Sequence, residues 1–337
     1  MEKEIYPIFD TEDTPVVFES SGFFIPYLSV ALQTILDTAD ANQNYDIIIL
    51  GDKIHPTDMD RILTQVANFR NISVRFFDPF EQVRPYVETA VYSYITVNYY
   101  RMALPWILRN YKKAVNLGAD ILVRKDIHQL CELTFEKGKY LAGARDLGYI
   151  GRLKEDIPQT ELDLAIPEEY INADVLIYNL EGIRADYTLD GVMATWQKHH
   201  YRCAEQDALN KLFDGHKQLI DLCWNTYPDR MTSTTDIMCT SPEFIAEWEN
   251  CLKDPFLVHF AAVPKPWDYP IIGFGDQWWD IAKKSVYYEE IIRRMANPKV
   301  HKQSSLSEIL DAIFPKGSRR REYVKKFKPK EKWGLNS

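Results

Sequence analysis

The sequence of 337 residues predicts an α/β fold with a mostly parallel central sheet. Between Thr14 and Leu117, short apolar runs alternate with segments whose apolar residues recur at helical spacing, which is the pattern of parallel βαβ units. The run Tyr45–Leu50 is apolar at almost every position, as expected for a strand that is buried on both faces. With 46% hydrophobic and 26% charged residues, the composition is that of a globular protein with a sizeable core.

The order of the predicted elements places one candidate residue at a sheet edge. Strands are expected at Val16–Phe18, Tyr45–Leu50, Ile72–Phe77, Ala114–Leu117, Tyr140–Arg145 and Val175–Tyr178. Helices are expected at Tyr27–Leu36, Thr57–Phe69, Val91–Leu108, Asp190–His199 and Gln206–Phe213. The strand that ends at Leu117 leads directly into Gly118 and Asp120, and open α/β sheets bind ligands at the carboxyl ends of their strands. Asp120 is therefore a candidate for chemistry.

Charge is distributed unevenly along the chain. Nine Lys and Arg residues and two Glu residues lie between Lys316 and Lys332, so this tail carries +7 of a total of -9 and the rest of the chain carries -16. Such an acidic body argues against nucleic-acid binding, which needs clustered basic residues. The tail interleaves Tyr323, Phe327 and Trp333 with its lysines, which fits docking on an anionic membrane surface as well as a solvated, flexible end.

The cysteines and the termini indicate a compartment. The five cysteines are odd in number, widely spaced and without a Cys-x-x-Cys pair, so we expect reduced thiols in a cytosolic protein. The segment Met1–Asp13 has no apolar run of the kind found in secretory signals, and no stretch approaches the ~20 apolar residues of a membrane span. The predicted location is the cytoplasm, with peripheral contact at the inner face of the membrane as an extension.

Four segments taken together are more specific than any one of them. They are Gly118–Ile127 (GADILVRKDI), Tyr170–Leu180 (YINADVLIYNL), Glu205–Asn210 (EQDALN) and Val258–Trp267 (VHFAAVPKPW). In this order and spacing they resemble the family-8 retaining glycosyltransferases, which include lipooligosaccharide galactosyltransferases, bacterial glucosyltransferases and glycogenin. Two upstream segments fit the same pattern, Pro26–Leu32 and Asn98–Met102, and the likeness extends from about Thr14 to Ile292.

The resemblance implies a fold, a domain plan and a reaction. The fold would be the Rossmann-like GT-A type, with a glycosyltransferase domain at 1–292 and a helical, basic extension at 293–337. Within the domain, a nucleotide-sugar half would occupy about 14–130 and an acceptor half about 131–292. The reaction would move a hexose, glucose or galactose, from a UDP-sugar to a saccharide, glycoprotein or glycolipid acceptor.

The metal motif of that family is incomplete in this chain. The family holds Mn²⁺ with an Asp-x-Asp at a strand end and a late His, since a diphosphate leaving group calls for a cation held by oxygen and imidazole ligands. The matching positions are Gly118, Asp120 and His259, so the first carboxylate is missing. Mn²⁺ binding would be weak, with Mg²⁺ or a metal-free reaction as alternatives. We hypothesise that Asp174 or Glu19 replaces part of the lost charge.

Other positions match residues that the family uses on the donor. Arg101 and Lys265 would lie near the diphosphate, and the Pro-Lys-Pro-Trp loop around Lys265 would hold its ammonium group in place. Where the family usually has a carboxylate for the uracil edge, this chain has neutral serines. The resulting donor-binding set is Ser20, Ser21, Arg101, Asp120, Asn172, Ala173 and Lys265.

The catalytic candidates are Gln206, Asp207 and Asp146. Glu205-Gln206-Asp207 replaces the usual Asp-Gln-Asp, and Gln206 matches the residue that faces the reactive carbon of the sugar. Because an amide is a poor nucleophile, the resemblance implies front-face retention, in which the departing phosphate helps to deprotonate the acceptor. Asp146 matches a carboxylate that binds sugar hydroxyls.

Two alternatives remain open at this point. Gly118, the two serines and Asp174 all depart from the family pattern, which would suit a non-catalytic homologue that acts as a binding or partner subunit. A metal-independent transferase, in which Lys265 and Arg101 stabilise the leaving group, is the second. A nicotinamide dehydrogenase is disfavoured because no Gly-x-Gly-x-x-Gly follows the first strand, and there is no Walker motif or Ser-His-Asp elbow.

Overall fold

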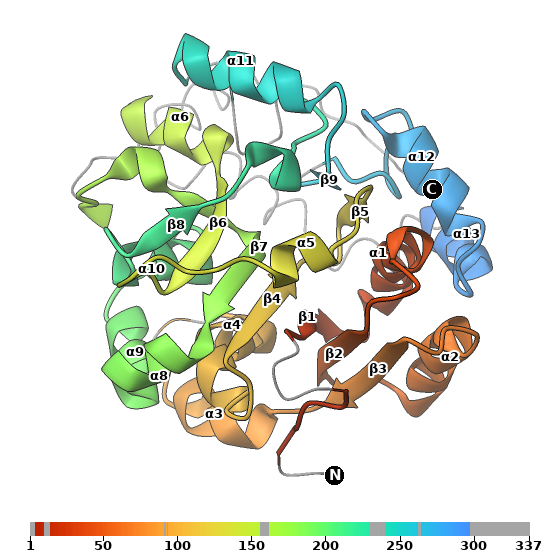
Figure 1. Ribbon diagram of the computed structural model, residues 1–337, viewed down its shortest axis with the longest axis horizontal. Helices are drawn as coiled ribbons and strands as arrows, with labels where there is room; N and C mark the ends of the chain where they lie inside the picture. The colour runs from red at the N-terminus through yellow and green to blue at the C-terminus, as the bar shows by residue number, and fades with distance from the viewer. Residues whose placement is uncertain are drawn as a thin grey trace, which may run out of the picture. The chain divides into compact units, whose positions relative to one another are not determined.

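A seven-stranded sheet forms the centre of the computed structural model (Figure 1). The structure describes residues 4–9, 14–90, 92, 94–155, 162–229, 237, 240–261 and 264–296. The chain divides into two units, Met1–Ile291 and Ile292–Ser337, and the fold that follows is that of the first. Most of the predicted basic extension, with its proposed membrane contact, lies outside the described residues.

The strand order is β3-β2-β1-β4-β7-β6-β8, and every neighbouring pair is parallel except those that involve β7. The mostly parallel sheet is therefore confirmed. The strands are β1 Val16–Ser21, β2 Tyr45–Asp52, β3 Ile72–Phe77, β4 Lys113–Leu117, β6 Leu141–Arg145, β7 Ile171–Asn179 and β8 Lys217–Leu219. Because β1 pairs with both β2 and β4, the strand order reverses between β1 and β4, and ligands bind at the carboxyl ends of strands beside such a switch point.

Helices cover both faces of the sheet. Successive residues of a strand face opposite sides, so Val16 and Phe18 join the core that contains α1, whereas Val17 joins the core that contains α4. The helices are α1 Ile25–Thr38, α2 Pro56–Val66, α3 Phe80–Glu88, α4 Thr96–Ile107, α5 His128–Cys131, α6 Leu147–Glu155, α8 Leu180–Asp186, α9 Leu189–Gln197, α10 Ala204–Leu212, α11 Pro242–Cys251, α12 Gly275–Ala282 and α13 Tyr288–Ala296, with 3₁₀ turns η1 Pro167–Glu169 and η2 Leu222–Asn225. None of the described helices is long and apolar enough to cross a membrane.

A separate two-stranded ribbon lies beside the sheet. It pairs β5 (Ile121–Val123) with β9 (Leu257–His259) in antiparallel fashion, with Ile121 opposite His259. The sequence did not predict either strand, since each spans only three residues. The ribbon matters because it holds Asp120, which directly precedes β5, close to His259, which ends β9.

Two predicted elements begin elsewhere in the structure, and one helix was not predicted. The helix expected over Val91–Leu108 begins only at Thr96, and α3 precedes it, unpredicted, with Pro85 in its interior. The strand expected at Val175–Tyr178 begins at Ile171, because its first residues pair with β6 across an irregular register. That extension places Asn172 and Asp174 on β7.

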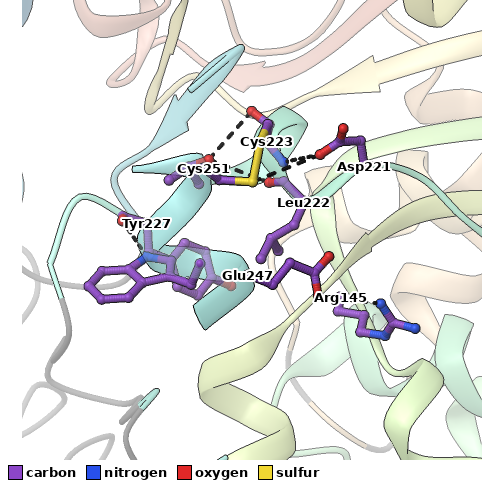
Figure 2. Close-up of a disulfide and its surroundings, with 9 residues drawn as sticks. Arg145, Asp221, Leu222, Cys223, Tyr227, Glu247 and Cys251 are labelled. Carbon is purple, nitrogen blue, oxygen red and sulfur yellow. Dashed lines mark hydrogen bonds and ion pairs between the residues drawn. A yellow bond between two sulfur atoms is a disulfide. The ribbon is translucent and has the colours of Figure 1, made fainter. Parts of the chain in front are cut away.

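A disulfide joins Cys223 in η2 to Cys251 at the end of α11 (Figure 2). The expectation of reduced thiols is wrong for this pair. The two cysteines are 28 residues apart and belong to no short motif, so only the packing of α11 against η2 brings them together. Trp248 of the same helix donates to the carbonyl oxygen of Tyr227 at 3.0 Å, which gives the contact a second anchor. Cys239 lies outside the described residues.

Reduction should destabilise the protein, because the disulfide closes a loop of 28 residues and restricts the unfolded chain. We expect a reductant to lower the free energy of unfolding by about 3 kcal/mol in urea titrations. The Cys223→Ser/Cys251→Ser double variant is the control and should not respond to the reductant. Identical unfolding curves for the wild type with and without reductant would contradict the pairing.

Candidate functional site

The candidate site lies at the carboxyl ends of β1 and β4, beside the switch point of the sheet. Ser20 and Ser21 end β1, and Gly118 follows β4. Because β7 runs antiparallel to β4, its first half lies at this same edge, and the backbone N–H of Gly118 donates to the carbonyl oxygen of Asp174 at 2.8 Å. Three separate parts of the chain thus converge on one edge.

Asp120, Asp174 and His259 form a cluster with the composition of a metal site. Their candidate ligand atoms all lie within 4.8 Å of one another. Nε2 of His259 is 3.6 Å from Oδ1 of Asp120 and 3.4 Å from Oδ2 of Asp174. The imidazole is 1% exposed, whereas the carboxylates of Asp120 and Asp174 are 19% and 32% exposed, so the cluster opens to solvent on its acidic side.

A chain of hydrogen bonds fixes the orientation of the imidazole. The backbone N–H of Asp174 donates to Oδ1 of Asn172 at 2.9 Å, which identifies that atom as an acceptor. The amide nitrogen of Asn225 donates to the same oxygen at 3.1 Å, so Oδ1 of Asn225 faces Nδ1 of His259 at 2.8 Å and accepts a hydrogen bond from it. Metal-binding histidines are commonly held in this way through the nitrogen that does not bind the ion.

Nε2 of His259 is therefore the atom that faces the two carboxylates. It is buried and has no hydrogen-bond partner among the described residues. A buried ring nitrogen without a hydrogen bond is costly unless a neighbouring charge or a ligand compensates for it. The donor set of one imidazole and two carboxylates suits a divalent ion such as Mn²⁺ or Zn²⁺, so the residues present fit a metal.

The charges of the cluster shift its proton equilibria. Burial by itself would lower the pKa of His259, but Asp120 and Asp174 outweigh it and raise this pKa to about 9. Burial would raise the pKa of Asp120, yet Lys265 and His259 hold it well below its usual range. For Asp174, the guanidinium of Arg101 outweighs burial and lowers the pKa. Both carboxylates are thus ionised at neutral pH and attract cations.

Lys265 lies against the same cluster. Its ammonium group contacts Oδ2 of Asp120 and donates to the carbonyl oxygen of Phe260 at 2.5 Å. The loop that carries it is held in place by Trp267, whose ring stacks on Tyr27 of α1 at 4.0 Å between centroids. Oδ1 and Oδ2 of Asp120 therefore face different partners, His259 and Lys265 respectively.

A second cluster surrounds Gln206. Its carbonyl oxygen accepts from Nδ2 of Asn172 at 3.1 Å and from the backbone N–H of Ala173 at 2.9 Å. Its Nε2 donates to Oδ2 of Asp146 at 3.1 Å and to the hydroxyl of Tyr170 at 3.1 Å. These four hydrogen bonds fix the amide in one orientation. Gln206, Asp146, Asn172 and Ala173, which were selected from four separate positions in the sequence, come together here.

Asp207 differs from its neighbour Gln206. It is 1% exposed, accepts from the Tyr170 hydroxyl at 2.6 Å and from the backbone N–H of Cys203 at 2.8 Å. It reaches the Gln206 cluster only through Tyr170. Ser20 likewise stays apart from the metal-type cluster, with its hydroxyl donating to the carbonyl oxygen of Ser21 at 3.1 Å.

Arg101 is held by three carboxylates. Its guanidinium lies 3.4 Å from Glu19, 3.1 Å from Asp174 and 3.0 Å from Glu205. Burial would lower the pKa of Arg101, but these carboxylates raise it well above its ordinary value. Burial raises the pKa of both Glu19 and Glu205 despite the opposing effect of Arg101. The guanidinium is thus committed to acidic side chains of the protein itself.

Sequence reasoning missed three residues that organise the two clusters. Asn225 orients His259, while the hydroxyls of Tyr170 and Tyr227 bind Gln206 and Asn172. Asn225 lies in a single 3₁₀ turn, and the tyrosines lie among many other aromatics, so no spacing distinguishes them. Only Tyr170 had a signal, since it begins the segment that contains Asn172.

The sequence matches one protein family and a named relative. Residues 15–270 match the family described as glycosyl transferase family 8. A Haemophilus influenzae protein named "Putative glycosyltransferase" is 23% identical over 263 residues, which cover 75% of this chain and 72% of that protein.

Two solved structures share the fold. The WbbM bifunctional glycosyltransferase matches with a TM-score of 0.79 and 23% identity, over 87% of this chain but only 53% of that one, so the chain spans about half of WbbM. The galactosyltransferase LgtC, solved with donor and acceptor sugar analogues, matches with a TM-score of 0.64 and 20% identity over 81% of this chain and 96% of its own. The GT-A type of fold is thereby confirmed. Since the family match covers most of the sequence, the chain belongs to glycosyl transferase family 8.

Proposed function

We propose that this glycosyltransferase moves a hexose, glucose or galactose, from a UDP-sugar to a glycan acceptor with retention of configuration. The observation that carries the proposal is the cluster of Asp120, Asp174 and His259 beside Lys265. It combines oxygen ligands, an imidazole nitrogen without a hydrogen bond and an ammonium group, which together suit a diphosphate and the divalent ion that accompanies it. LgtC, which shares the fold, was solved with donor and acceptor sugar analogues and supports this choice of substrates.

Each cluster has its own task in this proposal. A bound Mn²⁺ would neutralise charge on the leaving diphosphate. Lys265 binds the same diphosphate and leaves Asp120 to do so. Asn172 links the two clusters, because its oxygen accepts from Asp174 while its nitrogen donates to Gln206 and Asp146. We expect the transferred sugar to lie against Asn172 and Gln206, directly beside the diphosphate.

The state of Gln206 favours front-face retention. Its amide is neutral, and both its oxygen and its nitrogen are already engaged in hydrogen bonds within the protein. Such a group positions the sugar and stabilises developing charge as a dipole rather than attacking the reactive carbon. The acceptor hydroxyl would then lose its proton to the departing phosphate on the same face.

Arg101 acts indirectly in this scheme. Because three carboxylates surround it, its charge holds Asp174, Glu19 and Glu205 in place rather than stabilising a leaving group. This arrangement weakens the metal-independent alternative, which relied on Arg101 together with Lys265. The acceptor class, the cytoplasmic location and the membrane contact of the basic tail stay predictions.

Loss of the Asp120 carboxylate should abolish activity. We expect Asp120→Asn to lower the rate of UDP-sugar hydrolysis in Mn²⁺ at least ~100-fold, since a proposed metal ligand loses its charge. Asp60→Asn, on the exposed face of α2, is the matched control and should leave the rate unchanged. Hydrolysis at the wild-type rate in excess chelator would instead support a metal-independent reaction, and absence of UDP binding in either condition would support the partner-subunit alternative.

Gln206 should matter for turnover more than for nucleotide binding. We expect Gln206→Ala to lower kcat by ~100-fold while the Kd for UDP, measured by calorimetry, stays within ~3-fold, because Gln206 touches neither Lys265 nor the metal-type cluster. Gln43→Ala, in the turn before β2 at the opposite edge of the sheet, serves as the control. An unchanged kcat would exclude a role for Gln206 in the transition state.

Arg101 should be essential for stability. Arg101→Met leaves three carboxylates without their partner and should lower the free energy of unfolding at pH 7 by about 3–5 kcal/mol. The exposed Arg84→Met should change it by less than ~0.5 kcal/mol.

The loss of unfolding free energy in Arg101→Met should also depend on pH. The folded-state pKa values of Glu19 and Glu205 are raised even with Arg101 present, and they should rise further in the variant. The folded variant then binds protons that the unfolded chain releases, so its stability increases as pH falls and the deficit shrinks. A deficit that grows on acidification would refute this account.

A further inference from the structure

Asp174 occupies the space that a side chain at position 118 would need. A Cβ built on Gly118 would lie 3.0 Å from both Cβ and Oδ1 of Asp174 and 2.9 Å from Oδ1 of Asp120. Real Cβ atoms essentially never come as close as the contact with Asp120, and the two contacts with Asp174 are tighter than nine in ten real Cβ contacts. A side chain at 118 would therefore require both Asp120 and Asp174 to shift.

Strand pairing explains why these two positions can exchange a side chain. Leu117 is opposite Val175 in the antiparallel pair β4–β7, so Gly118 is opposite Asp174, and the hydrogen bond from the Gly118 N–H to the Asp174 carbonyl oxygen confirms this. Directly opposed residues of an antiparallel pair project their side chains to the same face of the sheet. A carboxylate on either residue therefore enters the same space beside Asp120.

The orientation of Asp174 is set by charge. Nη2 of Arg101 lies 3.1 Å from Oδ1 of Asp174, which leaves Oδ2 facing Nε2 of His259 at 3.4 Å. Glu19, the other acidic candidate, is occupied elsewhere. Its Oε1 accepts from Asn116 at 2.7 Å, and its side chain is 1% exposed. Of these two carboxylates, the one of Asp174 thus faces Nε2 of His259.

We propose that Asp174 is a metal ligand that replaces, from the neighbouring strand, the carboxylate missing at Gly118. The inference rests on the proposed function for its setting, but the ion that it concerns is any divalent cation held by Asp120, Asp174 and His259. Arg101 acts as a positioning residue, since it binds the oxygen of Asp174 that faces away from the imidazole.

Mn²⁺ binding to the full-length protein tests the proposal directly. The free Mn²⁺ signal in electron paramagnetic resonance falls as the ion binds, which gives an affinity without any catalytic assay. We expect Asp174→Asn, which keeps the shape of the side chain and an oxygen for Arg101, to weaken Mn²⁺ binding at least ~10-fold. Glu19→Gln is the matched control, because it removes the other carboxylate beside Arg101 and should change the affinity by less than ~3-fold.

An exchange of the two positions provides a gain-of-function test. Gly118→Asp alone should destabilise the protein, since its side chain would crowd both Asp120 and Asp174. The double variant Gly118→Asp/Asp174→Gly moves the carboxylate from β7 to position 118, directly after β4. It should bind Mn²⁺ at least ~10-fold more tightly than Asp174→Asn. Unfolding curves of each variant establish that the comparison is made between folded proteins.

Several results would overturn the proposal. One is an Mn²⁺ affinity of Asp174→Asn equal to that of the wild type. Another is a loss of Mn²⁺ affinity in Glu19→Gln as large as that in Asp174→Asn. The third is a folded double variant that binds Mn²⁺ no more tightly than Asp174→Asn. Calorimetry with UDP separates this failure from that of the proposed function. If the wild type binds UDP but not Mn²⁺, the proposal that Asp174 is a metal ligand is refuted and the proposed function is not. If Mn²⁺ binds in a manner that depends on Asp174 but UDP does not bind, the proposed UDP-sugar donor is refuted and the metal site stands.

Discussion

The antiparallel pairing of β7 with β4 is the constraint on which the site depends. In a sheet that is otherwise parallel, one reversed strand brings its first residues to the edge where its neighbours end. Asn172 and Asp174 thereby reach the carboxyl end of β4, where Gly118 and Asp120 lie. Had β7 run parallel, these residues would lie at the opposite edge, and the edge beside the switch point would lack the amide of Asn172 and the carboxylate of Asp174.

The balance of buried charge at this edge favours a cation. Four carboxylates, those of Glu19, Asp120, Asp174 and Glu205, surround two permanent cations, Arg101 and Lys265. Two of these carboxylates, Asp120 and Asp174, raise the pKa of His259, and the same negative charge would repel a free anion. A divalent ion removes both effects at once, which is consistent with the unpaired nitrogen that His259 directs at the carboxylates.

The disulfide restrains a segment that orients residues of the site. Cys223 and Asn225 belong to the same 3₁₀ turn, so the bond to Cys251 restrains the turn whose asparagine orients both His259 and Asn172. The rigid amides then fix which nitrogen of the imidazole faces the cluster. Stability and site geometry are therefore linked through one short segment that carries no recognisable motif.

The sequence by itself determined the succession of the main strands along the chain, because buried strands appear as apolar runs. It also determined the family and most of the residues that gather at the edge, because the motifs keep their spacing along the chain. It also showed that a carboxylate was missing at Gly118, and it left Asp174 and Glu19 as equal substitutes. Only the tertiary structure distinguishes these two carboxylates. The cross-strand register places Asp174 beside His259, whereas Glu19 accepts a hydrogen bond from Asn116. The role of Arg101 as a partner of three carboxylates, the support from Asn225 and the disulfide were likewise decided only in three dimensions, because each joins residues that are distant in the chain and bear no pattern in common.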